Sequence, residues 1–256
     1  MTILVLQTVC LTSVHLIPEP VIVCPDLPCK SGRFNSGHDY LFSVITGCSP
    51  ISNFSFTTEP DVAPCIQRPV DLVFLLDSSE RLGLKEFDYI HEFLHKVADR
   101  LGLAQSDKDS MRARLALIEF SDIVNVAFPL THDPAIIAEG MKHVPKMETS
   151  SEVGPAIIFA IDNILGKGRT LKTRPNAEVS FVFITDGITG SNHLEEAVSA
   201  MRSSQVVSTV IATGSDIDQE VLTKLAMGDQ NAIFKFKDFS GLSRSALFDR
   251  FIRWVC

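Results

Sequence analysis

The chain has 256 residues, of which 45% are hydrophobic, and 31 Asp and Glu outnumber 23 Lys and Arg to give a net charge of −8. This length and composition allow one large globular domain with a smaller segment beside it. The acidic balance predicts no broad basic surface for nucleic acid, and the 14 glycines do not recur at every third residue, so no triple helix lies within these residues.

The cysteines avoid the long central part of the chain. The six are Cys10, Cys24, Cys29, Cys48, Cys65 and Cys256. Cysteines confined to the edges of a domain are typical of an oxidising compartment, where they form disulfides, so we expect a secreted protein. In that setting Asn53, which opens the sequence Asn53-Phe54-Ser55, is a candidate glycosylation site. The apolar stretch 1–17 could act as a signal sequence but lacks a basic start, and we expect no membrane insertion.

The character of the sequence changes near residue 66. Residues 1–65 contain many prolines and most of the cysteines and show little hydrophobic periodicity. We therefore expect an irregular, partly disordered N-terminal segment. Residues 66–256 alternate apolar runs with amphipathic stretches, and we expect them to form one α/β domain.

The apolar runs predict strands that are covered on both faces, because they lack the alternation of a half-buried strand. Strands are expected over 70–76, 113–120, 123–128, 179–184, 206–212 and 232–236. Helices are expected over 87–101, after 133, and over 153–165, 193–202, 219–226 and 247–255. Strands that alternate with helices predict a doubly wound, mostly parallel sheet with helices on both faces. The short turn at 121–122 predicts a hairpin, which adds one antiparallel edge strand.

Acidic and hydroxyl residues follow two of these strands. Asp77-Ser78-Ser79 comes after strand 70–76, and Thr185-Asp186-Gly187 comes after strand 179–184. Ligands of doubly wound sheets bind at the carboxyl ends of the strands, so Asp77 and Asp186 are expected on one rim. A third loop, 149–154, contributes Ser151. Carboxylates and hydroxyls without His or Cys are hard oxygen ligands, which suit Mg²⁺ better than zinc.

This order of strands and loops resembles the von Willebrand factor A-type domain with its metal-ion-dependent adhesion site. The resemblance covers residues 67–256 and implies that the metal ligands are Asp77, Ser79, Ser151 and Asp186, with Ser151 replacing a threonine. It also implies an adhesion module rather than an enzyme.

One residue departs from the family pattern, because Arg81 stands where a second serine is expected. A guanidinium at about 4 Å from a divalent ion would cost about 8 kcal/mol at an effective dielectric constant of about 20. We therefore expect a degenerate site that binds Mg²⁺ weakly or not at all, and no other cofactor.

Within the family, some stretches resemble the last globular domain of collagen VI chains, namely residues 23–29, 65–71, 74–83 and 248–256. This resemblance implies a secreted extracellular-matrix module whose activity is protein–protein binding. Its partners would be other collagen VI-type chains and matrix or cell-surface proteins. The alternative is a Mg²⁺-dependent adhesion domain that grips an acidic residue of its ligand.

A more distant alternative is a zinc peptidase. His91-Glu92-Phe93-Leu94-His95 fits the H-E-x-x-H pattern, in which histidines at i and i+4 share a metal. The apolar stripe of the same helix predicts that His91 and His95 face solvent. Glu119, a candidate third ligand, falls inside an expected strand. We therefore expect no catalytic residues.

Cys65 and Cys256 are expected to form a disulfide. Parallel strands begin at the edge opposite the Asp77–Asp186 rim, and the connecting helices return to it. Cys65 precedes the first strand and Cys256 follows the last helix, so both belong to that edge. The bond would close a loop of 256 − 65 = 191 residues, for which the chain-entropy model gives roughly 5 kcal/mol as an upper estimate.

Overall fold

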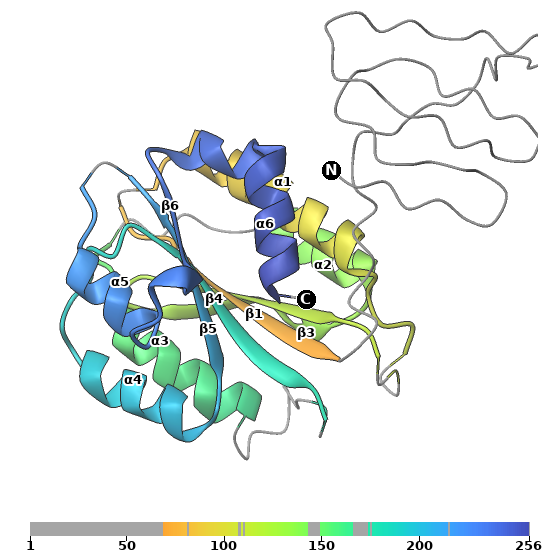
Figure 1. Cartoon of the computed structure of the whole chain (residues 1–256), viewed down its shortest axis with the longest axis horizontal. Helices are drawn as coiled ribbons and strands as arrows, with labels where there is room; N and C mark the ends of the chain where they lie inside the picture. The colour runs from red at the N-terminus through yellow and green to blue at the C-terminus, as the bar shows by residue number, and fades with distance from the viewer. Residues whose placement is uncertain are drawn as a thin grey trace, which may run out of the picture. The chain divides into compact units, whose positions relative to one another are not determined.

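The computed structural model describes residues 69–80, 82–106, 109, 111–142, 149–165, 174, 176–214 and 216–255. These residues form a six-stranded sheet with helices on both faces (Figure 1). Several predictions lie outside the described residues: the irregular segment 1–65, the cysteines with the Cys65–Cys256 disulfide, the glycosylation site at Asn53, and the side chain of Arg81.

The sheet has the strand order β3-β2-β1-β4-β5-β6. The strands are β1 (Val70–Asp77), β2 (Arg114–Phe120), β3 (Val124–Thr131), β4 (Glu178–Thr185), β5 (Val207–Thr213) and β6 (Ile233–Phe236). Neighbouring strands run parallel, except that β3 pairs antiparallel with β2 at one edge. The predicted doubly wound sheet with one antiparallel edge strand is therefore confirmed.

Strand β1 shows why the apolar runs predicted the fold. All its residues are buried, and they divide between two cores. Leu72, Phe74 and Leu76 face one core, whereas Val73 and Leu75 face the other. A strand between two helical layers needs apolar side chains at every position, because neither face meets water.

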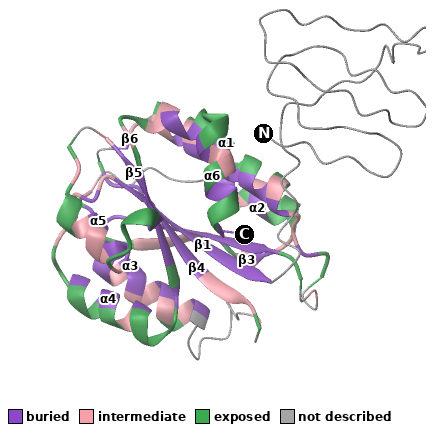
Figure 2. Cartoon of the chain, in the orientation of Figure 1, coloured by how far each residue is buried: buried purple, intermediate pink, exposed green. Residues whose placement is uncertain are grey.

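Two sets of helices cover the two faces (Figure 2). One face carries α1 (Leu84–Leu101), α2 (Pro134–Lys142), the 3₁₀ turn η3 (Phe239–Ser243) and α6 (Ser245–Val255). The other carries α3 (Val153–Ala160), the π-helical turn η1 (Ile161–Leu165), α4 (Leu194–Ser203), α5 (Gln219–Leu225) and the 3₁₀ turn η2 (Gln230–Ala232). Of the helices in the described ranges, none is both long and apolar enough to cross a bilayer.

Two helix ends show how the sequence sets their limits. Helix α1 ends at Leu101 and is followed by Gly102, whose φ of 62° is left-handed and suits glycine. The helix predicted over 153–165 is α-helical only to Ala160 and continues as a π-helical turn. In this turn the amide of Asn163 donates to the carbonyl oxygen of Phe159 at 2.8 Å, a side-chain contact that competes with the regular backbone ladder.

A buried ionic cluster fastens the end of the sheet where β1 begins. The Asp71 side chain is fully buried and accepts from the Arg114 guanidinium at 3.0 and 2.8 Å. The backbone and guanidinium of Arg174 donate to the same carboxylate at 2.9–3.1 Å, and Arg174 Nη1 donates to the Asp109 carbonyl at 2.6 Å. The loop before β4 is thus tied to β1 and β2 at the edge opposite the predicted rim.

Candidate functional site

The candidate site lies where the strand order reverses, at the carboxyl ends of β1 and β4. These central strands are parallel neighbours, and Leu76 pairs with Ile184 near their carboxyl ends. The connections from them leave toward opposite edges of the sheet, which opens a crevice above the two strand ends. Asp77 closes β1, and Asp186 directly follows β4, so the structure places both predicted carboxylates on one rim.

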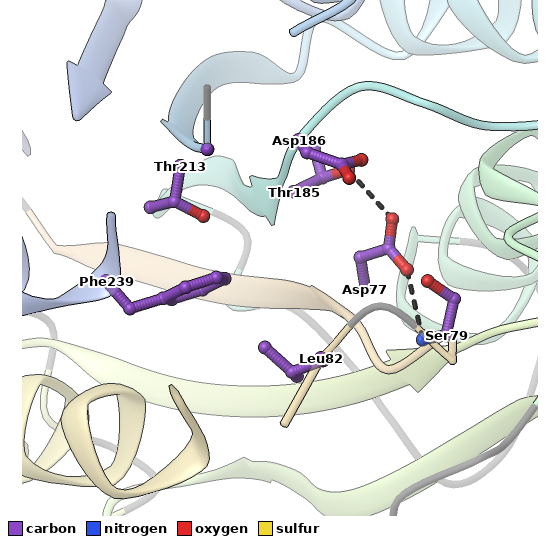
Figure 3. A pocket seen from close by; sticks show the side chains of 8 residues that line it. Asp77, Ser79, Leu82, Thr185, Asp186, Thr213 and Phe239 are labelled. Atoms are coloured by element: carbon purple, nitrogen blue, oxygen red, sulfur yellow. Dashed lines mark hydrogen bonds between the residues drawn. The ribbon is translucent and has the colours of Figure 1, made fainter. Parts of the chain in front are cut away.

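Asp77 is the centre of this rim. Its Oδ2 accepts hydrogen bonds from Ser151 Oγ at 2.9 Å and from Thr185 Oγ1 at 2.8 Å. Its Oδ1 accepts from the backbone N–H of Ser79 at 3.2 Å, and Figure 3 shows Asp77 between the Thr185–Asp186 turn and Ser79. The structure therefore brings Asp77, Ser79 and Ser151 together, and Thr185 is an additional member that the sequence analysis did not assign.

Burial raises the pKa of the Asp77 carboxyl, and the hydrogen bonds from Ser79, Thr185 and Ser151 act in the opposite direction. The hydroxyl groups thus offset part of the cost of keeping a carboxylate away from water. A cation beside Asp77 would favour its ionised form further.

Backbone hydrogen bonds fix the loops that form the rim. The Ser78 N–H donates to the Phe120 carbonyl at 2.9 Å, and the Glu80 N–H donates to the Thr149 carbonyl at 3.0 Å. The Glu152 N–H donates to the Ser121 carbonyl at 3.0 Å. The hairpin between β2 and β3 therefore contacts the loops on both sides of Asp77 through backbone hydrogen bonds.

Two hollows open at this rim. The first, of about 130 Å³, is lined by Asp77, Ser79, Leu82, Thr185, Asp186, Thr213, Gly214 and Phe239. The second, of about 170 Å³, is lined by Ser79, Glu80, Thr149, Ser150, Ser151, Glu152, Ile188, Thr189 and Gly190. Ser79 belongs to both, so the two hollows adjoin.

The side chains around the first hollow offer oxygen atoms only as possible metal ligands. Carboxylates of Asp77 and Asp186 with hydroxyls of Ser79 and Thr185 form a donor set that fits a hard cation such as Mg²⁺. Within the described ranges, no group of three or more His, Cys, Asp or Glu side chains forms a metal-binding cluster.

The sequence analysis missed the residues that shape the first hollow beyond its carboxylates. Thr213 ends β5, next to β4, and a hydroxyl at that strand end was a usable signal. Leu82 and Phe239 supply apolar walls. Phe239 could not be found in the same way, because it belongs to a short 3₁₀ turn without a periodic pattern.

The H-E-x-x-H segment lies on α1 and does not contribute to either hollow. His95 is exposed as predicted, but His91 is partly buried with its Nε2 shielded from solvent, so the prediction that both histidines face solvent is wrong for His91. The exposed Glu92 accepts from Lys96 Nζ at 2.6 Å and from Ser243 Oγ at 3.1 Å. Glu119 is fully buried in β2, where its carboxylate accepts from Asn125 at 3.0 Å. The arrangement that a zinc peptidase requires, with both histidines beside a third ligand, is not found among these described residues.

Comparison with known proteins gives one family and several matrix proteins. Residues 71–248 match the von Willebrand factor type A domain. The chain is 46% identical over 246 residues to the collagen alpha-2(VI) chain of Gallus gallus, which covers 94% of this chain and 21% of that protein. It is 26% identical to human matrilin-1, over 72% of this chain and 38% of that protein. The chain thus spans about a fifth of the length of the collagen relative.

Solved structures of the same fold include proximal thread matrix protein 1 from the mussel byssus, in a form whose metal-ion-dependent adhesion site (MIDAS) motif is occupied by zinc. Its TM-score is 0.65 at 18% identity, over 75% of this chain and 49% of that chain. At this identity the likeness shows the fold alone.

Proposed function

Because this chain belongs to the von Willebrand factor type A domain family, we propose that it assembles with collagen VI-type chains and binds matrix or cell-surface proteins. The observation that carries the proposal is the ordered rim around Asp77, with its two adjoining hollows, in a domain 46% identical to part of a collagen VI chain. Protein binding is its activity.

The matches confirm the family resemblance and the narrower resemblance to collagen VI chains. Collagen VI and the matrilins are secreted proteins of the extracellular matrix, and the predicted location of this chain is confirmed by them. Their A-type domains are adhesion modules without catalytic activity, which supports a non-enzymatic role here.

The rim supports binding because its loops are already held in place. Hydrogen bonds from Ser151 and Thr185 orient Asp77, and the β2–β3 hairpin fixes the neighbouring loops. A partner that docks on such a surface loses less free energy to the ordering of loops than one that must organise them.

A divalent ion would be held by Asp77, Ser79, Ser151 and Asp186, and it would supply positive charge for an acidic residue of a partner. We propose that binding by this chain does not depend on such an ion. Arg81 adds a positive charge to the same loop in place of a hydroxyl ligand, and a dication is repelled twice as strongly as a single charge.

The test is a binding measurement with the full chain immobilised and purified collagen VI in solution. We expect saturable binding that EDTA leaves unchanged and that Asp186→Ala weakens at least about tenfold, the loss of about 1.4 kcal/mol of contact energy. The matched control is Asp162→Ala, an exposed carboxylate in the turn at the far end of α3. Absence of binding, or equal losses in the two variants, would contradict the proposal.

A further inference from the structure

We propose that the first hollow takes up the ammonium group of a lysine side chain that the protein partner presents. This inference rests on the proposed function, since it names the chemistry by which the rim would recognise a partner. The hollow combines a carboxylate floor, a buried hydroxyl that lacks a partner, and apolar walls.

The unpartnered hydroxyl belongs to Thr213. This residue is 1% exposed, and its Oγ1 is buried without a hydrogen-bond partner in the described structure. Thr213 lines the hollow with Asp77 and Asp186, and Figure 3 shows Thr213 and Phe239 on one side and the two aspartates on the other. Buried hydroxyls are nearly always paired, so an oxygen atom left unpaired at the wall of a hollow points to a donor from a ligand.

The walls suit the rest of a lysine side chain. Leu82 is buried and Phe239 partly buried, and both border the hollow of about 130 Å³. A lysine covers apolar surface with its methylene groups and keeps its charged end in a polar environment. Its ammonium group donates three hydrogen bonds, and the hollow is lined by acceptor groups of the right kind, namely the hydroxyl of Thr213 and the carboxylates of Asp77 and Asp186.

The charge of the lining favours a cation. Asp77 and Asp186 line the first hollow, and Glu80 and Glu152 line the adjoining one. The described lining of the two hollows contains no Lys or Arg, so a cationic side chain would meet only opposite charge there. An acidic side chain of a partner would meet like charge unless a metal ion intervened.

The experiment is a titration of the ¹⁵N-labelled full chain in EDTA with Nα-acetyl-lysine N-methylamide, followed through the amide signals of Asp186, Thr213 and Gly214. Nα-acetyl-norleucine N-methylamide serves as the apolar probe, and Nα-acetyl-glutamate N-methylamide with added MgCl₂ as the acidic one. We expect saturable shifts of these amide signals with the lysine probe and not with the other two probes. We also expect a high concentration of Mg²⁺ to compete with the lysine probe for the hollow.

Thr213→Val should weaken the lysine probe about tenfold, the effect of one hydrogen bond to a charged group. Valine has a similar shape, and no internal hydrogen bond is lost, so the variant should fold. The matched control is Thr209→Val. The Thr209 hydroxyl is buried on the same face of β5 but lies outside the hollow, and it accepts a hydrogen bond from Trp254 Nε1 at 3.0 Å. This control variant should leave probe binding unchanged.

Binding of both variants to collagen VI separates the two proposals. If collagen VI binds but Thr213→Val and free lysine probe have no effect, the lysine inference is wrong and the proposed function stands. If no matrix protein binds, the proposed function fails. Equal shifts from the lysine and norleucine probes, or binding of the glutamate probe only with Mg²⁺, would also overturn the lysine inference.

Discussion

The two ends of β1 each bury an aspartate, and they do so in opposite ways. Asp71 is surrounded by the guanidinium groups of Arg114 and Arg174, which donate to both of its oxygens. Asp77 is held by hydroxyls and one backbone N–H and borders a hollow. Full pairing with opposite charge closes a site, whereas neutral donors orient a carboxylate and leave its charge available to a ligand.

The difference assigns separate tasks to the two edges of the sheet. The edge at Asp71 joins β1, β2 and the loop before β4 through charge pairs that are largely buried. The edge at Asp77 carries the loops and hollows of the candidate site. Changes at the first edge should therefore alter stability, and changes at the second should alter binding.

The largest effect is expected from the predicted disulfide, which would fasten the Asp71 edge covalently. Replacing Cys65 and Cys256 together by serine should lower the free energy of unfolding by up to roughly 5 kcal/mol, because the unfolded chain regains the freedom of a long loop. Urea unfolding of the oxidised protein measures this loss. Free thiols at both positions in the secreted protein would refute the pairing.

Asp71→Asn should lower the free energy of unfolding by about 3–5 kcal/mol, because it leaves two largely buried guanidinium groups without their carboxylate. The control is Asp249→Asn, whose ion pair with Arg100 spans 4.0 Å with both side chains partly exposed; it should cost at most about 1 kcal/mol. The two variants are compared by urea unfolding at neutral pH. Equal losses of unfolding free energy in the two variants would mean that the buried ionic cluster stabilises the domain no more than a partly exposed ion pair does.

A third buried carboxyl, that of Glu119, differs from both aspartates. In the described part of the chain it has neither the guanidinium groups that surround Asp71 nor the several hydroxyls that surround Asp77. Asn125 donates to its Oε2 at 3.0 Å, while Oε1 is buried without a partner among the described residues. Burial raises the pKa of Glu119 to about 7, and the hydrogen bond from Asn125 lowers it only in part. At neutral pH the folded chain must therefore carry a poorly compensated charge or bind a proton.

The pH dependence follows from the raised pKa. The unfolded carboxyl titrates near its model value of 4.5 and the folded one near 7, so stability from this group is full below about pH 4.5 and is lost as the pH rises to about 7. Glu119→Gln should remove this slope and raise stability at pH 7.5 by on the order of 1–3 kcal/mol. Thermal unfolding from pH 5 to pH 7.5 measures both effects, and an unchanged slope would contradict them.

The smallest effect concerns Mg²⁺ at the Asp77 edge. Arg81→Ser restores the hydroxyl that the family pattern has and removes one positive charge, so the variant should bind Mg²⁺ more tightly than the parent chain. Isothermal titration calorimetry measures both affinities. Tight binding by the parent chain, unchanged in the variant, would contradict the degenerate site.

The sequence predicted what depends on local pattern. The apolar runs located the strands of the sheet, and Asp77 and Asp186 were placed on one rim because each follows a strand. The ionic cluster was not predicted, because Arg174 lies 103 residues from Asp71 and a charged residue at a strand end looks the same whether it is paired or not. Thr213 could have been assigned to the rim because it directly follows a predicted strand, but only the structure shows that its buried hydroxyl has no partner among the described residues.

The most direct test of the account compares Asp71→Asn with Asp77→Asn for both unfolding free energy and affinity for collagen VI. We predict that Asp77→Asn loses at least about tenfold in affinity and little stability, since neutral donors surround it. Asp71→Asn should lose stability, while its folded fraction binds collagen VI as the parent chain does. If Asp77→Asn binds normally, or if affinity follows stability in both variants, the rim around Asp77 is not the binding face.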